Sequence, residues 1–163
     1  MLLSPAKGTL LRSAVIALFC GAVTASAADQ FYLGTWKIAT AVVAPWADPT
    51  ERPPDPAEMK SLVGKSVVIK TNEIAGPRAL ACRAPNYEVV DYPADMLFQG
   101  AFDEMRRRDK SVDPHKLAAK LGFRGSKWKT LETGCGNELD YHFAGPNTAE
   151  FGLNDYVDRL KKQ

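Results

Sequence analysis

Residues 134–162, GCGNELDYHFAGPNTAEFGLNDYVDRLKK, decide the fold that we predict for this chain. Apolar and polar residues alternate on both sides of residues 145–147 (GPN), and the alternation resumes after residues 154–155 (ND). A period of two indicates a strand with one buried face. Gly, Asn and Asp suit the positive φ angles of tight turns. The stretch therefore predicts three antiparallel strands joined by two hairpins.

The lengths of the two turns predict which residues face one another. A two-residue loop at 154–155 places His142, Glu150 and Arg159 in one row on the outer face, where we expect a solvated row of charges across three strands. The same register turns Asp158 inward, opposite Phe151, unless a bulge rotates it outward. A three-residue loop at 145–147 places three pairs on the inner face: Phe143 with Ala149, Tyr141 with Phe151, and Leu139 with Leu153.

The first 28 residues have the pattern of a cleaved export signal. Lys7 and Arg12 form a basic start, residues 14–23 are apolar, and residues 25–27 (ASA) form a small-residue cleavage site. This order is typical of a secretory signal peptide, and the apolar run is too short to span a bilayer. A lipoprotein signal at Cys20 is the weaker alternative, because bulky Phe19 precedes that cysteine.

The charge balance and length of residues 29–163 limit the kinds of partner and the number of domains that we expect. The full chain has 21 basic and 19 acidic residues, and the signal segment holds two of the basic ones, so 19 of each remain. This balance gives no reason to expect nucleic acid or an anionic membrane as a partner. No later stretch is apolar enough to cross a membrane. We expect residues 29–163 to form a single domain, periplasmic or secreted.

Two cysteines remain once Cys20 leaves with the signal. Cys82 and Cys135 are an even number in an exported chain, which favours a disulfide bond between them. A metal site is the alternative, but it needs more thiols or histidines near these two residues than the sequence holds. The bond would close a loop of more than fifty residues and stabilise the fold by roughly 4 kcal/mol.

The middle of the chain supplies further strands and short helices. Runs rich in Val, Ile and Thr indicate strands. Asp followed by Pro marks a helix start, and apolar residues at three- and four-residue spacing mark a helix face. The predicted strands span residues 31–44, 66–71, 79–83, 87–92 and 128–135. The predicted helices span residues 55–64, 94–108 and 113–122.

The whole pattern predicts a mainly β fold: a small antiparallel up-and-down barrel of seven or eight strands, with two or three short helices at its side or rim. Parallel pairing would need crossover connections longer than most of those present.

A resemblance to a known family begins at residues 34–36 (GTW), just before a predicted strand. These residues resemble the Gly-X-Trp signature of lipocalins and related small secreted β-barrels, and the closing strand meander is similar to that family too. The resemblance implies an up-and-down barrel whose closed end is plugged by Trp36. The chain is equally similar to small secreted barrels that inhibit lysozyme or proteases.

Motifs for catalysis are missing from the sequence. There is no Gly-X-Ser-X-Gly turn, no phosphate loop and no His-Glu-X-X-His helix, so we expect no enzyme and no cofactor. Asp140, His142 and Glu150 have the residue types of a zinc site. Arg159 stands next in the same row and would repel a metal ion, so we predict no metal there.

Two hypotheses of function follow. In the first, the barrel binds a small apolar molecule between Trp36, Tyr141, Phe143 and Phe151, with Asp158 facing the same space. In the second, the chain binds an envelope protein, for instance as an inhibitor of a periplasmic or foreign hydrolase. There the proline-rich loop 45–56 would use Trp46 as an anchor, unless that side chain packs as a lid. A ligand pocket of about 300 Å³ or more would favour the first hypothesis.

Overall fold

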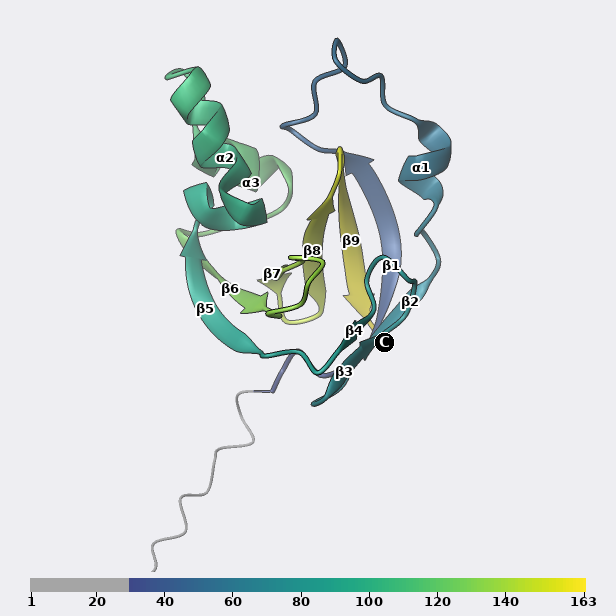
Figure 1. The fold of residues 1–163 in the computed structure, drawn as a ribbon. Coiled ribbons are helices and arrows are strands. Elements are labelled where there is room, and N and C mark those ends of the chain that lie inside the picture. The colour runs from purple at the N-terminus through teal and green to yellow at the C-terminus, as the bar shows by residue number, and fades with distance from the viewer. Residues whose placement is uncertain (1–29) are drawn as a thin grey trace, which may run out of the picture.

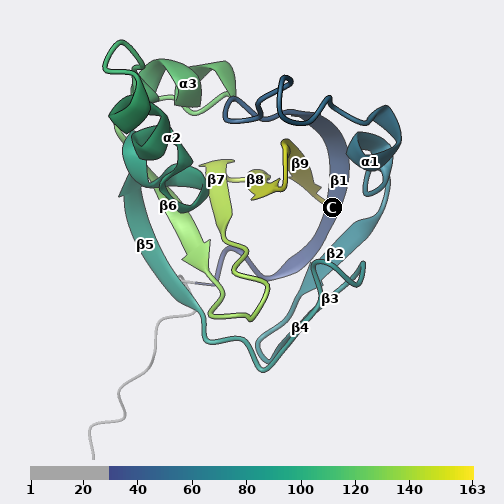
Figure 2. The ribbon, with the colours of Figure 1, turned by 45° about the horizontal axis from the view of Figure 1, so that its top comes forward.

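The computed structural model describes residues 30–163, so the expected signal peptide lies outside the described residues. Nine antiparallel strands form one sheet in the order β4-β3-β2-β1-β9-β8-β7-β6-β5. The sheet curls into a half-barrel, which is clearest in Figure 2. The mainly β, antiparallel prediction is confirmed, with one or two more strands than predicted. The strands are β1 (Gly34–Val43), β2 (Ser66–Ile69), β3 (Glu73–Ala75), β4 (Cys82–Arg83), β5 (Glu88–Pro93), β6 (Lys127–Glu132), β7 (Tyr141–Gly145), β8 (Thr148–Leu153) and β9 (Tyr156–Lys162).

The helices lie at one end of the curl, with α1 on the side of β1 and with α2 and α3 on the side of β5 (Figure 1). Asp55 caps α1 by accepting a hydrogen bond from the Ala57 N–H, and Asp113 caps α3 in the same way. Both caps precede a proline, as the sequence predicts. The helical segments are α1 (Pro56–Lys60), the 3₁₀ turn η2 (Ala94–Met96), α2 (Leu97–Arg108) and α3 (Pro114–Lys120).

The closing meander has the predicted register. Phe143 pairs with Ala149, and on the next hairpin Phe151 pairs with Asp158. A bulge at the end of β7 shortens the first turn to two residues without changing that pairing. The prediction for Leu139 was wrong, because this residue lies in the loop before β7. Its carbonyl accepts a hydrogen bond from the Thr133 hydroxyl at 2.8 Å, which satisfies it without a strand partner.

Two apolar cores lie on opposite faces of the sheet. The inner core fills the curl and includes Trp36, Leu131 and Phe151. The second core lies between the outer face and the helices, and it includes Phe98 and Phe102 of α2. The prediction that the outer face of the closing strands is solvated is therefore wrong. The helices cover it, because their apolar face needs a surface to pack on.

Helix α2 begins with three left-handed residues. Phe98, Gln99 and Gly100 have φ angles of 52°, 54° and 78°, so the continuous helix predicted over residues 94–108 is broken at its first turn. Left-handed backbone costs a non-glycine residue about 1–2 kcal/mol. The turn is held because buried Phe98 packs in the outer core and its N–H donates to His142 Nε2 at 2.9 Å.

The predicted disulfide is present. Cys82 and Cys135 are bonded with their α-carbons 6.0 Å apart. Cys82 belongs to the edge strand β4, whereas Cys135 lies in the loop after β6, because that strand ends at Glu132 and does not reach Cys135 as predicted. Because β4 and β5 are the two free edges of the half-barrel, the bond ties one edge to a loop from the opposite side.

Candidate functional site

The aromatic residues predicted to line a ligand space form a packed inner core. None of the four, Trp36, Tyr141, Phe143 and Phe151, is more than 6% exposed. The rings of Trp36 and Phe143 lie 5.6 Å apart, and those of Tyr141 and Phe151 lie 5.7 Å apart. The structure thus brings all four together, edge to face, and most of the space between them is filled by side chains. Their use as ligand walls stays a prediction.

Asp158 points to the inner side, as the register predicts, and borders a hollow of about 130 Å³. The residue is 3% exposed, and its Oδ1 atom has no hydrogen-bond partner. Burial raises the pKa of this carboxyl to about 6. The hollow lies between α1 and the β8–β9 hairpin, and its volume is below the roughly 300 Å³ of a drug-sized ligand site.

The predicted charge row is buried rather than solvated. His142 and Glu150 are 0% and 1% exposed. Arg159 Nη2 lies 2.6 Å from Glu150 Oε1 and also donates to the Leu121 carbonyl at the end of α3. Burial raises the pKa of Glu150 to about 7, against the opposing effect of the Arg159 guanidinium. The row therefore fastens the helices to the sheet.

His142 has both ring nitrogens engaged. Nε2 accepts from the Phe98 N–H, so Nδ1 carries the proton and donates to the Thr130 hydroxyl at 2.8 Å. Burial lowers the pKa of this imidazole to about 3, which keeps it neutral. Asp140, predicted on the same strand, lies in the loop before β7 instead. Among residues 30–163, no three His, Cys, Asp or Glu side chains are grouped as metal ligands.

Trp46 packs against the outer core, so its side chain is a lid and not a free anchor. Its ring lies 5.2 Å from that of Phe98, and its Nε1 donates to the Asn154 carbonyl at 3.0 Å. A Cβ on Gly152 would lie 3.0 Å from the indole, so a larger residue there would require the Trp46 ring to shift by a few tenths of an ångström. The side chain is half-buried, and it holds the proline-rich loop against the β8–β9 turn.

Further contacts brace this loop against the same turn. The Asp155 carbonyl accepts from the Ala44 N–H at 2.8 Å. Asn154 Nδ2 donates to Glu58 at 2.8 Å, and the Tyr156 hydroxyl accepts from the Asp55 N–H at 2.7 Å. Sequence patterns mark a cap at Asp55 and a turn at 154–155. They hold no signal that the two meet, because about a hundred residues separate them.

A surface groove of about 320 Å³ runs between the braced loop and the end of α2. Its walls combine apolar and charged side chains from two segments: Pro45, Trp46, Ala47, Asp48 and Pro49 from the loop, and Met105, Arg108, Asp109 and Val112 from α2 and the residues after it. We call the surface made by residues 44–62, 105–112 and 153–156 the rim. It lies at the upper end of the half-barrel in Figure 1.

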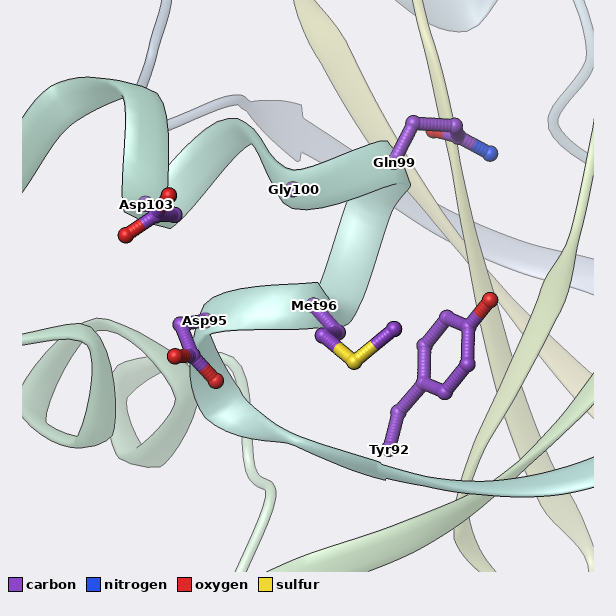
Figure 3. A pocket seen from close by; sticks show the side chains of 6 residues that line it. All are labelled: Tyr92, Asp95, Met96, Gln99, Gly100 and Asp103. Carbon is purple, nitrogen blue, oxygen red and sulfur yellow. The ribbon is translucent and has the colours of Figure 1, made fainter.

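A second hollow, of about 260 Å³, opens where β5 passes into α2. Figure 3 shows Asp95 and Asp103 at one end of it and Tyr92 with Gln99 at the other. These polar groups already have partners within the chain. Both aspartates hold Arg106, and the Tyr92 hydroxyl donates to Glu132. The hollow is therefore a weaker candidate than the rim for binding another molecule.

Comparisons with protein families, curated proteins and solved structures find no match for this chain. Over residues 30–163, no helix has the length and apolar character needed to cross a bilayer.

Proposed function

We propose that this chain is a non-enzymatic, exported binding module whose partner is another protein, held at the rim. The braced proline-rich loop is the observation that carries the proposal. Binding costs free energy when loops must be ordered, and a loop already held by its own contacts avoids much of that cost. Residues 44–60 are held at four points on the β8–β9 turn, and the groove beside them offers both apolar and charged walls.

An inhibitor of a periplasmic or foreign hydrolase is one form that such a module takes. A rigid loop beside a groove can occupy or flank the active-site cleft of an enzyme, while the filled inner core gives the loop a firm support. The expected export of the chain places it in the compartment where such enzymes act.

Binding of a small apolar ligand, in the manner of lipocalins, is the second candidate. Trp36, the residue that carries the resemblance, is fully buried in the inner core. A ligand between Trp36, Phe143 and Phe151 would have to displace contacts that these rings make with one another or with other aromatic side chains.

Capture from an envelope extract, followed by reconstitution with the purified partner, tests the proposal. Arg108 lines the groove, whereas the adjacent Arg107 does not. Both are exposed and both pair with Glu104, so Arg107→Glu is a matched control for Arg108→Glu. We expect Arg108→Glu to weaken the isolated complex by at least about tenfold, with Arg107→Glu close to wild type.

Equal affinities for the two variants would overturn the assignment of the rim. Native mass spectrometry of the same preparation tests the second candidate. A small molecule bound to the purified protein, with no protein partner captured, would favour that candidate over the proposed function.

A further inference from the structure

The hollow beside Asp158 has features of a site that binds a positively charged side chain. The Asp158 carboxylate belongs to its lining, with Oδ1 unpartnered and the residue 3% exposed. No described Lys, Arg or His forms an ion pair with Asp158, although eleven other ion pairs are present in residues 30–163. Burial of a polar group without a partner costs several kcal/mol, so a structure that keeps one has a use for it or holds water there.

The walls suit a long basic side chain better than a bare ion. Met59, Leu62 and Leu153 are apolar, while Ser61 and Asn154 are polar and exposed. An Arg or Lys side chain has the same division, with an aliphatic stem and a charged head. Two exposed lining residues, Ser61 and Asn154, belong to the rim, and a third, Ala79, precedes β4, so the hollow opens beside the rim.

The volume fits a guanidinium group. About 130 Å³ holds roughly four water molecules at about 30 Å³ each, and a guanidinium group has four heavy atoms. Guanidinium is also less strongly hydrated than ammonium and is the preferred cation for buried ion pairs. Arg52 pairs with Glu58, which belongs to the lining, and with Asp155, but Arg52 does not itself line the hollow.

We infer that this hollow receives an arginine side chain of the protein partner, whose guanidinium pairs with the Asp158 carboxylate. That the arginine belongs to a partner rests on the proposed function. That the hollow binds a guanidinium group does not, so the two statements are tested separately.

Titration with small probes, followed by two-dimensional NMR of the backbone amides, tests the guanidinium site without any partner. The probes are N-acetyl-arginine amide and its neutral analogue N-acetyl-citrulline amide. We expect saturable shifts at Leu62 and Leu153 with the arginine probe, and affinity for the citrulline probe lower by on the order of tenfold. Asp158→Asn should remove the preference for arginine, whereas Asp91→Asn, at an exposed site on β5, should leave it unchanged.

A second variant tests the hollow without removing the negative charge of Asp158. Ala79→Phe places a ring on the exposed wall of the hollow, and it should block the arginine probe while Asp158 is intact. The inference is wrong if the arginine probe shifts nothing, if both probes bind equally, or if Asp158→Asn binds as wild type does.

The source of the arginine is decided by a third comparison. A capped pentapeptide with an internal arginine between glycines should bind at least as well as free arginine, because the peptide backbone stays outside the hollow. Binding of free arginine with exclusion of the peptide would assign the hollow to a small metabolite and overturn the partner-side-chain inference.

Discussion

At the scale of single residues, three buried polar side chains shape this protein in different ways. His142 is neutral and fully partnered, and it links the sheet to α2. Glu150 is buried and forms an ion pair with the partly exposed Arg159. Asp158 has no such partner, and burial alone raises its pKa. His142 and Glu150 hold the helices in place, whereas the Asp158 carboxylate can pair with a cationic group of another molecule.

The unpartnered carboxylate of Asp158 should make stability depend on pH in an uncommon direction. Its pKa of about 6 in the folded protein exceeds the unfolded value of about 3.9. Between these values the folded state binds more protons, so stability falls as pH rises through that window and is lowest above it. We expect Asp158→Asn to be more stable than wild type by about 3 kcal/mol at pH 8 and by about half as much at pH 5, which lies inside that window.

Urea unfolding of both proteins at pH 5 and pH 8 measures this effect. The difference between variant and wild type isolates Asp158, because Glu150 and Asp140, whose pKa values are also raised, titrate in both proteins. A variant less stable than wild type at pH 8 would contradict the expectation.

At the scale of elements, the first turn of α2 is the least regular part of the fold. Its left-handed residues turn Phe98 into the outer core and bring Gln99 Nε2 to the Glu138 carbonyl at 3.1 Å. The strain is offset by this packing and by the hydrogen bond from the Phe98 N–H to His142. The helix beyond it is regular, and Arg106–Arg108 at its end pair with acidic residues one turn earlier.

Gly100→Ala should destabilise the protein by about 1 kcal/mol. The φ angle of 78° suits glycine, and a Cβ there would meet only the Asp95 carbonyl at 3.8 Å, so strain rather than collision sets the cost. Gly136→Ala is the control, since its φ is ordinary and no atom lies within 4 Å of the added Cβ. Thermal unfolding measures both variants. Equal melting temperatures would show that the turn is not strained.

At the scale of the whole molecule, a disulfide bond connects the two open sides of the curled sheet. The half-barrel leaves β4 and β5 as edges, and β4 is only two residues long. Such a short edge adds few hydrogen bonds of its own. The Cys82–Cys135 bond anchors it to the loop after β6, and Asn137 Nδ2 donates to the Ala79 carbonyl beside it at 3.1 Å.

Replacing both cysteines, Cys82→Ala with Cys135→Ala, should reduce the free energy of unfolding by about 4 kcal/mol. The two residues are 53 positions apart, and the chain-entropy model gives that value for a loop of this length. Guanidinium denaturation of the double variant, compared with the oxidised wild type, measures the loss. A change below about 1 kcal/mol would show that the hydrogen bonds and apolar contacts of β3 and β4 hold this edge without the bond.

The sequence alone determined the features that depend on neighbouring residues. Period-two alternation and turn length are local, so they predicted the register that places Phe151 against Asp158 and Glu150 against Arg159. The two cysteines of a chain that we expect to be exported predicted the disulfide in the same direct way. Neither inference needed the position of a distant segment.

Only the tertiary structure decided which surfaces are covered and which are free. His142, Glu150 and Arg159 alternate with apolar residues whether their face meets water or a helix, so the pattern is the same in both cases. Their burial depends on Phe98 and Leu121, from segments far away in the chain. The brace at the rim and the hollow beside Asp158 likewise arise where residues 44–62 meet the β8–β9 hairpin. Contacts over such separations depend on how the whole chain packs, and local sequence patterns do not encode them.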